Sequence, residues 1–162
     1  MRILVTAASM YGGTAGIADA IGRTLEEESL EVDVLPVDEV SDLEGYDSIV
    51  LGSGVYAGRW LRSARRFADE HADALSEKPT WLFSSGPIGD PPKPNGEDAV
   101  KLGAIPDRTQ ANGHRLFAGR LDKSRMTFAD KAIVTAVRSP EGDFRDWEAV
   151  QEWAGEIAKA LK

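Results

Sequence analysis

The chain contains no cysteine among its 162 residues. Disulfides, thiolate nucleophiles, cysteine-ligated zinc and iron–sulfur clusters are therefore excluded, and a chain without disulfides is typical of a cytoplasmic protein. Positive charge is also scarce, because 19 lysines and arginines face 27 aspartates and glutamates, which gives a formal net charge of −8. Nucleic acids and anionic membrane surfaces attract basic proteins, so this acidic balance disfavours both as partners.

Long apolar runs are missing as well. The longest uncharged stretch, residues 3–18, is interrupted by three glycines and is shorter than the roughly 20 apolar residues of a membrane-spanning helix. It also loses its apolar character too early for a signal peptide. The chain has only two histidines, His71 and His114, and neither has metal-ligand spacing with a partner. We therefore expect no stable membrane insertion and no metal site.

Strand-like and helix-like segments alternate along the chain. Short apolar runs that end in small residues are typical of buried parallel strands, and apolar residues spaced by three and four are typical of helices. The predicted strands are residues 3–6, 31–37, 48–52, 80–83 and 115–118. The predicted helices are residues 14–28, 60–75 and 147–161, with a further short helix near 97–102. The segment 31–37 alternates in polarity, which indicates a strand near the sheet edge with Pro36 at its end.

Strands separated by helices imply a parallel sheet with right-handed crossovers. We therefore predict an α/β fold with a doubly wound, five-stranded parallel sheet, in a single domain over residues 1–162. In such a sheet the ligand binds at the carboxyl ends of the strands. The residues that follow the strands should therefore be chemically unusual.

The segment after the first strand has the character of an anion-binding loop. Gly12 and Gly13 allow a tight turn, and the helix that follows directs unpaired N–H groups into it. Ser9 and Thr14 add hydroxyl donors, and no lysine or arginine lies in the loop, so neutral donors alone would hold a phosphate there. The alternative is an ordinary turn with Thr14 as helix N-cap. The loop matches neither the P-loop nor G-x-G-x-x-G, which disfavours nucleoside triphosphates and dinucleotides.

Two other strand ends share this composition of small and polar residues, at 52–60 and 84–89. A planar ring could stack on Tyr56 or Trp60, although Trp60 taken alone is more simply a core residue. A G-x-S-x-G nucleophile elbow is absent, which disfavours a hydrolase. The three strand ends together predict one ligand crevice.

In these motifs the chain resembles flavodoxin-fold proteins, with the strand order 2-1-3-4-5. The resemblance is carried by residues 3–14, 49–53 and 84–86. It is most similar to the flavodoxin-domain family that includes the menaquinone-dependent protoporphyrinogen dehydrogenases, through residues 52–60, 117–121 and 146–148. In those enzymes the segment before the last helix is longer, basic and aromatic. Here residues 122–145 are short and contain Asp130, Glu141 and Asp143, which favours a soluble flavoprotein.

The resemblance implies FMN as the cofactor. The phosphate would be held by Ser9, Met10, Tyr11, Gly12, Gly13 and Thr14. The isoalloxazine ring would be flanked by Val55, Tyr56, Ala57, Gly58, Arg59, Trp60, Ser84, Ser85, Gly86, Pro87, Ile88 and Gly89. Ser53 would be a further cofactor-binding residue. Because FMN itself carries the chemistry, no catalytic side chain is predicted.

Two functional classes remain open from the sequence. The first is an FMN flavoprotein, either an electron carrier or a small FMN-dependent oxidoreductase of the protoporphyrinogen dehydrogenase type. Its partner would be a redox protein or a quinone-like small molecule. The alternative is a flavodoxin-like interaction domain without a cofactor, which would be colourless and would present a large exposed apolar patch.

Overall fold

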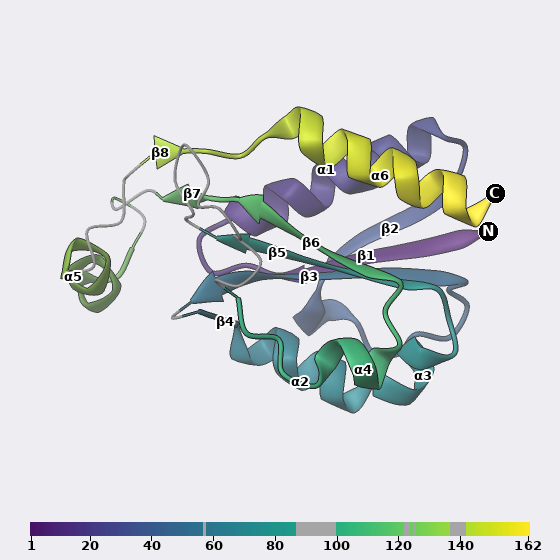
Figure 1. The fold of residues 1–162 in the computed structure, drawn as a ribbon, viewed down its shortest axis with the longest axis horizontal. Helices are drawn as coiled ribbons and strands as arrows, with labels where there is room; N and C mark the ends of the chain where they lie inside the picture. The colour runs from purple at the N-terminus through teal and green to yellow at the C-terminus, as the bar shows by residue number, and fades with distance from the viewer. Residues whose placement is uncertain (57, 87–99, 122–123, 125, 137–141) are drawn as a thin grey trace.

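A central parallel sheet of five long strands organises the molecule (Figure 1). The computed structural model describes residues 1–56, 58–86, 100–121, 124, 126–136 and 142–162. The long strands are β1 (Arg2–Ala8), β2 (Glu31–Pro36), β3 (Ser48–Tyr56), β5 (Thr80–Gly86) and β6 (Gly113–Ala118). Their order is β2-β1-β3-β5-β6. This is the predicted order 2-1-3-4-5, because β4 (Arg59–Trp60) is a two-residue strand that pairs antiparallel with the end of β3.

Helices cover both faces of the sheet (Figure 1). One face carries α1 (Gly13–Glu27) and α6 (Trp147–Leu161). The other face carries α2 (Arg62–Glu70), α3 (Ala72–Ser76) and α4 (Ile105–Thr109), with the 3-10 turn η1 (Val37–Glu39) after β2. The elements β7 (Arg120–Leu121), α5 (Phe128–Ala136) and β8 (Gly142–Asp143) project beyond the carboxyl ends of the strands, at the left of Figure 1. No helix within the described ranges is long and apolar enough to cross a membrane.

The core lies in two layers because successive strand residues point to opposite faces. In β1, Ile3 and Val5 pack toward α1 and α6, whereas Leu4 and Ala8 pack toward α2. The central strands are buried on both sides, as the continuous apolar runs predicted. By contrast β2 is an edge strand of intermediate burial that ends at Pro36, also as predicted.

Three strands extend further than predicted at their carboxyl ends, and the first of them, β1, reaches Ala8 instead of residue 6. The segment expected to end at residue 52 continues to Tyr56, and the segment expected to end at residue 83 continues to Gly86. The reason is pairing, since the register runs on through Ser53↔Ser84 and Gly86↔Ala118. Small residues at these strand ends resembled loop sequence, but neighbouring strands on both sides keep them extended.

The helix predictions need three corrections. Residues 60–75 do not form one helix, because Trp60 belongs to β4 and the helix is interrupted at His71, between α2 and α3. The apolar period did not reveal that break, because Ala72 and Leu75 remain buried on the same side. Of the helix expected at 97–102, residues 97–99 lie outside the described ranges and 100–102 are not helical. The helix in this region is α4 instead. The helix α5 was not predicted.

Candidate functional site

The carboxyl ends of β1, β3 and β5 lie side by side, as predicted (Figure 1). The register pairs Ala8 with Ser53 and Ser53 with Ser84. The loop 9–14 is therefore next to the end of β3, and the end of β3 is next to the end of β5. The three unusual strand ends form one region, which is the candidate site.

The loop after β1 presents free backbone donors. Gly12 has a left-handed φ of 85°, precedes the first residue of α1, and donates its N–H to Ser9 Oγ at 3.1 Å. Within the described chain no side chain caps α1. The N–H groups of Gly13, Thr14 and Ala15 consequently have no partner within the helix. Three such donors at the positive end of a helix fit a phosphate group.

Thr14 is not the N-cap that the sequence suggested. It is the second residue of α1 and is buried. A Cβ placed on Gly54 would lie 3.1 Å from Thr14 Oγ1. Gly54 therefore lets the end of β3 approach the helix start closely.

Two arginines distant in sequence reach this loop. Arg120 donates to the Tyr11 carbonyl at 2.7 Å, and Arg145 donates to the Gly13 carbonyl at 3.4 Å. Arg145 also pairs with Asp143 at 2.6 Å, which lowers the pKa of that carboxyl group through its hydrogen bonds and positive charge. Two cations therefore lie beside the loop, although the loop itself contains none. The prediction that neutral donors alone would hold a phosphate stays a prediction.

Sequence reasoning did not identify these arginines as site residues because they lie more than a hundred positions from the loop. The one available signal was the segment 117–121, which contains Arg120 and contributed to the family resemblance. Nothing in the composition around Arg145 distinguishes it from a surface residue. Its side chain is nevertheless only 11% exposed and stacks over the Trp147 ring at 4.6 Å.

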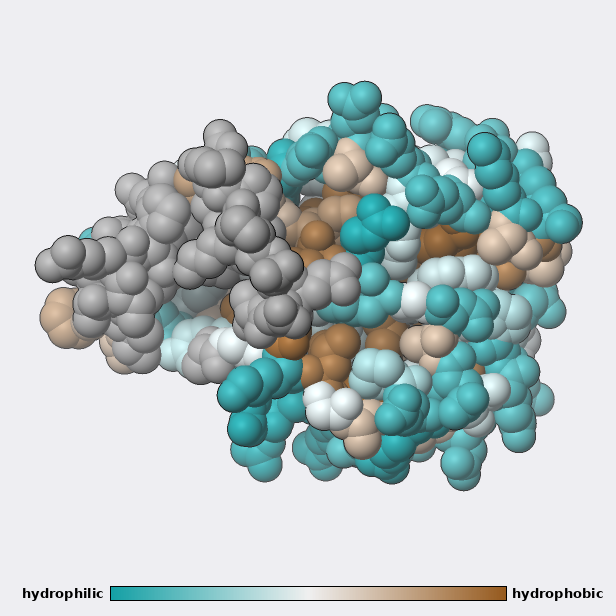
Figure 2. Space-filling view, viewed as in Figure 1, coloured by the Kyte–Doolittle hydropathy of each residue, from teal (hydrophilic) through white to brown (hydrophobic). Residues whose placement is uncertain are grey.

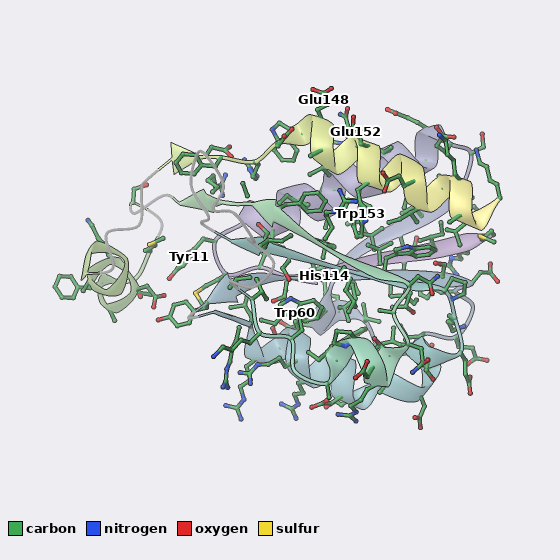
Figure 3. All side chains as sticks on the ribbon, viewed as in Figure 1. Tyr11, Trp60, His114, Glu148, Glu152 and Trp153 are labelled. Carbon is green, nitrogen blue, oxygen red and sulfur yellow. The ribbon has the colours of Figure 1, made fainter. Side chains whose placement is uncertain are left out.

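Asp130 of α5 joins two of the predicted site residues. One carboxylate oxygen accepts a hydrogen bond from Tyr11 Oη, and the other accepts one from Tyr56 Oη at 2.9 Å. These two bonds lower the pKa of Asp130, and the bond to Asp130 raises the pKa of Tyr56. The side chain of Tyr11 is labelled in Figure 3 between α5 and the sheet. The Tyr11–Asp130–Tyr56 clamp therefore fixes α5 beside the strand ends.

Two predicted site residues, Ser53 and Ser84, form hydrogen bonds within the protein. Ser53 Oγ donates to the Gly54 carbonyl at 2.8 Å and accepts from the Leu61 N–H at 3.0 Å. Ser84 Oγ accepts from Trp60 Nε1 at 2.7 Å and lies 2.7 Å from His114 Nε2. Both serines are fully buried. Their hydroxyl groups hold the strand ends in place.

Trp60 cannot stack on a ligand, contrary to its prediction as a site residue. It is only 2% exposed and packs in the α2-side core, so its ring is not available to a ligand. The core interpretation of Trp60 is the one that the structure supports (Figure 3). Tyr56, at 38% exposure, remains the aromatic residue at this strand end with an accessible ring.

The other predicted residues lie at the strand ends. Met10 and Arg59 are exposed, Val55 and Gly58 are partly buried, and Ser85 is buried. Gly86 accepts from the Gly119 N–H at 2.7 Å, and a Cβ on Gly119 would lie 3.0 Å from the Gly86 backbone. The last group lies outside the described ranges: Ala57, Pro87, Ile88 and Gly89.

These features define a class of protein. A doubly wound sheet places a phosphate-sized set of N–H donors beside an accessible tyrosine at the switch point between strands, where such folds bind nucleotides. The residues present fit a mononucleotide with an aromatic ring system. With the resemblance of the sequence to flavodoxin-fold proteins, they indicate the class of FMN-binding α/β proteins.

The chain belongs to the flavodoxin domain family, whose model matches residues 4–148. Membership indicates FMN as the cofactor and electron transfer as the general function, as predicted. A curated relative, protoporphyrinogen IX dehydrogenase [quinone] of Escherichia coli strain K12, is 23% identical over 98% of this chain and 95% of its own length.

Solved structures show the same fold. Oxidised flavodoxin 1 from Bacillus cereus has a TM-score of 0.65 and 21% identity, with complete coverage of both chains. Rubredoxin oxygen:oxidoreductase from Desulfovibrio gigas has a TM-score of 0.66 and 15% identity. The similarity covers 99% of this chain but only 36% of that larger one.

Proposed function

We propose that the chain is a cytoplasmic FMN-dependent oxidoreductase of the protoporphyrinogen dehydrogenase type, acting as a single domain. It would take electrons and protons from a small organic substrate and deliver the electrons to a quinone-like acceptor or a redox protein. FMN, when bound, supplies the one- or two-electron chemistry, and the protein supplies position and electrostatics.

The loop 9–14 would hold the FMN phosphate. The unpaired N–H groups at the start of α1 would donate to phosphate oxygens. Arg120 and Arg145 brace the loop through the carbonyls of Tyr11 and Gly13 and add positive charge beside it. Tyr56 would lie against the ring from the end of β3.

The position of α5 is the observation that carries the proposal. An electron carrier needs little more than an exposed flavin edge. Here β7, α5 and β8 lie at the carboxyl end of the sheet, and Asp130 of α5 bonds to both Tyr11 and Tyr56. A helix fixed beside the strand ends would give a small substrate a second surface to contact. The curated relative, matched over nearly all of both chains, supports the same reaction class.

The test starts with the visible spectrum of the purified protein and an FMN titration followed by flavin fluorescence. We expect a yellow protein or saturable quenching. Oxidation of protoporphyrinogen IX is then followed anaerobically by porphyrin fluorescence, with menadione as acceptor. Turnover should require FMN, and should be lost in the phosphate-loop variant Gly13→Asp but kept in Gly13→Ala.

The outcomes separate the functional classes. A protein that binds FMN but oxidises no protoporphyrinogen would be an electron carrier instead. A colourless protein that does not respond to FMN would overturn the flavoprotein assignment and leave the cofactor-free interaction domain.

A further inference from the structure

Four arginines lie close together at the site end of an otherwise acidic molecule. Arg59 lies in β4, and Arg62, Arg65 and Arg66 lie in the first half of α2; all four are exposed. We call this set the arginine face. Because the whole chain carries −8, the residues outside the arginine face carry −12. Figure 2 shows hydrophilic side chains projecting where α2 begins, and Figure 3 shows nitrogen-tipped side chains there.

Internal contacts leave much of this charge available. Arg66 pairs with Glu70 at 3.1 Å, and Arg65 Nε donates to the Trp60 carbonyl at 3.2 Å. Among the described residues, Arg59 and Arg62 have no acidic partner. Within the described residues, no salt bridge neutralises Arg59 or Arg62, so the arginine face keeps part of its positive charge.

The order of charges along α2 is unfavourable for helix stability. The positive end of a helix dipole favours acidic residues, and its negative end favours basic ones. In α2 the arginines come first, and Asp69 and Glu70 come last. Arg62 is also three and four positions from Arg65 and Arg66, where like charges repel. Helix stability does not explain this arrangement, whereas a need for positive charge at this end of the sheet does.

The arginine face adjoins the candidate cofactor site. Arg59 pairs with Tyr56 in the β3–β4 ladder, and α2 begins at Arg62, directly beyond β4 and Leu61. A macromolecule bound to these side chains would lie next to the end of β3. That is where electrons would enter or leave a ring held by Tyr56.

We propose that the arginine face is the docking surface for an acidic redox protein with clustered carboxylates. All four cations are arginines, which pair with carboxylates through two parallel hydrogen bonds and are enriched in protein interfaces where lysine is depleted. An anionic membrane fits less well, because Asp69 and Glu70 share α2 with the arginines and a broad anionic surface would meet both signs of charge. None of the exposed large apolar side chains in the described chain lies on α2. The electron-transfer role of docking rests on the proposed function, but the binding itself does not.

The test uses a plant-type [2Fe–2S] ferredoxin as the acidic probe. Its affinity is measured by isothermal titration at low salt, on the protein with and without FMN. The variant Arg62→Glu/Arg66→Glu is compared with Arg23→Glu/Lys159→Glu, which makes the same charge change on α1 and α6. Reduction of bound FMN is then timed with ferredoxin and with a small neutral reductant.

We expect the Arg62/Arg66 variant to weaken ferredoxin binding and slow reduction by ferredoxin about tenfold or more, with a smaller salt dependence. The α1/α6 variant should stay within about twofold of the wild type. Reduction by the neutral reductant should be the same in all three proteins. Equal ferredoxin affinity in both variants, or no ferredoxin binding by the wild type, would overturn the docking surface.

Two further results have distinct meanings. If the wild type binds no FMN, the proposed function fails, while the titration without FMN still decides the docking surface. If vesicles of phosphatidylglycerol bind the wild type through Arg62 and Arg66 and ferredoxin does not, the surface faces a membrane and the protein partner is wrong.

Discussion

Gly13 is the residue at which helix stability and cofactor binding can be separated. It is the first residue of α1, and a Cβ there would meet Arg120 at an ordinary 3.5 Å. Gly13→Asp should leave folding intact, because an acid at this position favours the helix by about 0.5 kcal/mol. It should nevertheless weaken FMN binding at least about tenfold, since its carboxylate would repel the phosphate.

Fluorescence titration measures the FMN affinity, and urea unfolding measures stability. Gly13→Ala adds a side chain without charge and serves as the control, with FMN affinity close to the wild type. Tight FMN binding by Gly13→Asp would place the phosphate away from α1.

Gly52 is required for packing rather than for the site. A Cβ on Gly52 would lie 2.2 Å from the ring of Phe83, which is completely buried and has no room to move. We expect Gly52→Ala to lower the free energy of unfolding by about 1–3 kcal/mol. A Cβ on Gly155 in α6 would meet no atom within 4 Å, so Gly155→Ala should instead stabilise the helix by up to about 1 kcal/mol. Urea denaturation measures the free energy of unfolding of both variants. Equal changes in the two would refute the packing role of Gly52.

At the scale of elements, α5 is held at the site by a clamp that depends on pH. The pKa of the Asp130 carboxyl group is lowered from 3.8. Its hydrogen bonds therefore stabilise the clamp fully above that pH, and this stabilisation is lost as the pH falls through the folded-state pKa. The pKa of Tyr56 is raised from 10.0, so its hydroxyl keeps donating up to and beyond that pH. The clamp should therefore be complete above about pH 4 and weaken in stronger acid.

Hydrogen exchange protection of the α5 amides tests this. Protection should be constant near neutral pH and should fall in acid. Asp130→Asn should lower protection at neutral pH, because a neutral amide accepts more weakly than a carboxylate. Asp19→Asn, an exposed change on α1, should have no effect on α5. Unchanged protection in Asp130→Asn would show that other contacts hold the helix.

The secondary-structure elements differ in how well the sequence predicts them. The long strands and the terminal helix followed from apolar periodicity, because burial imposes that pattern directly. The strand order came from the resemblance to flavodoxin-fold proteins instead. The ends of β3 and β5 were missed because their extended shape depends on neighbouring strands. For the candidate site, local composition pointed to Gly12 and Gly13. Arg120, Arg145 and Asp130 act through contacts that only the folded chain creates.

At the scale of the whole molecule, FMN should act as a stabilising ligand. Free FMN at a hundred times its Kd should add about 2.7 kcal/mol to the free energy of unfolding, which is roughly 5–10 °C in Tm for a chain of this length. Riboflavin has the same ring without the phosphate, so its shift should be clearly smaller at equal concentration. A thermal scan with each ligand makes the measurement. Equal shifts for FMN and riboflavin would show that the loop 9–14 does not bind the phosphate.

The long sequence separations in the candidate site set an order of events during synthesis. Arg120 follows Tyr11 by 109 residues, and Arg145 follows Gly13 by 132. A ribosome that adds about 5–20 residues per second would complete the loop roughly 5 to 20 seconds before Arg120 exists. The helix α6, made later still, packs in the same core layer as α1. We therefore expect FMN to bind only once the chain is nearly finished, so that translation proceeds without stabilisation by the cofactor.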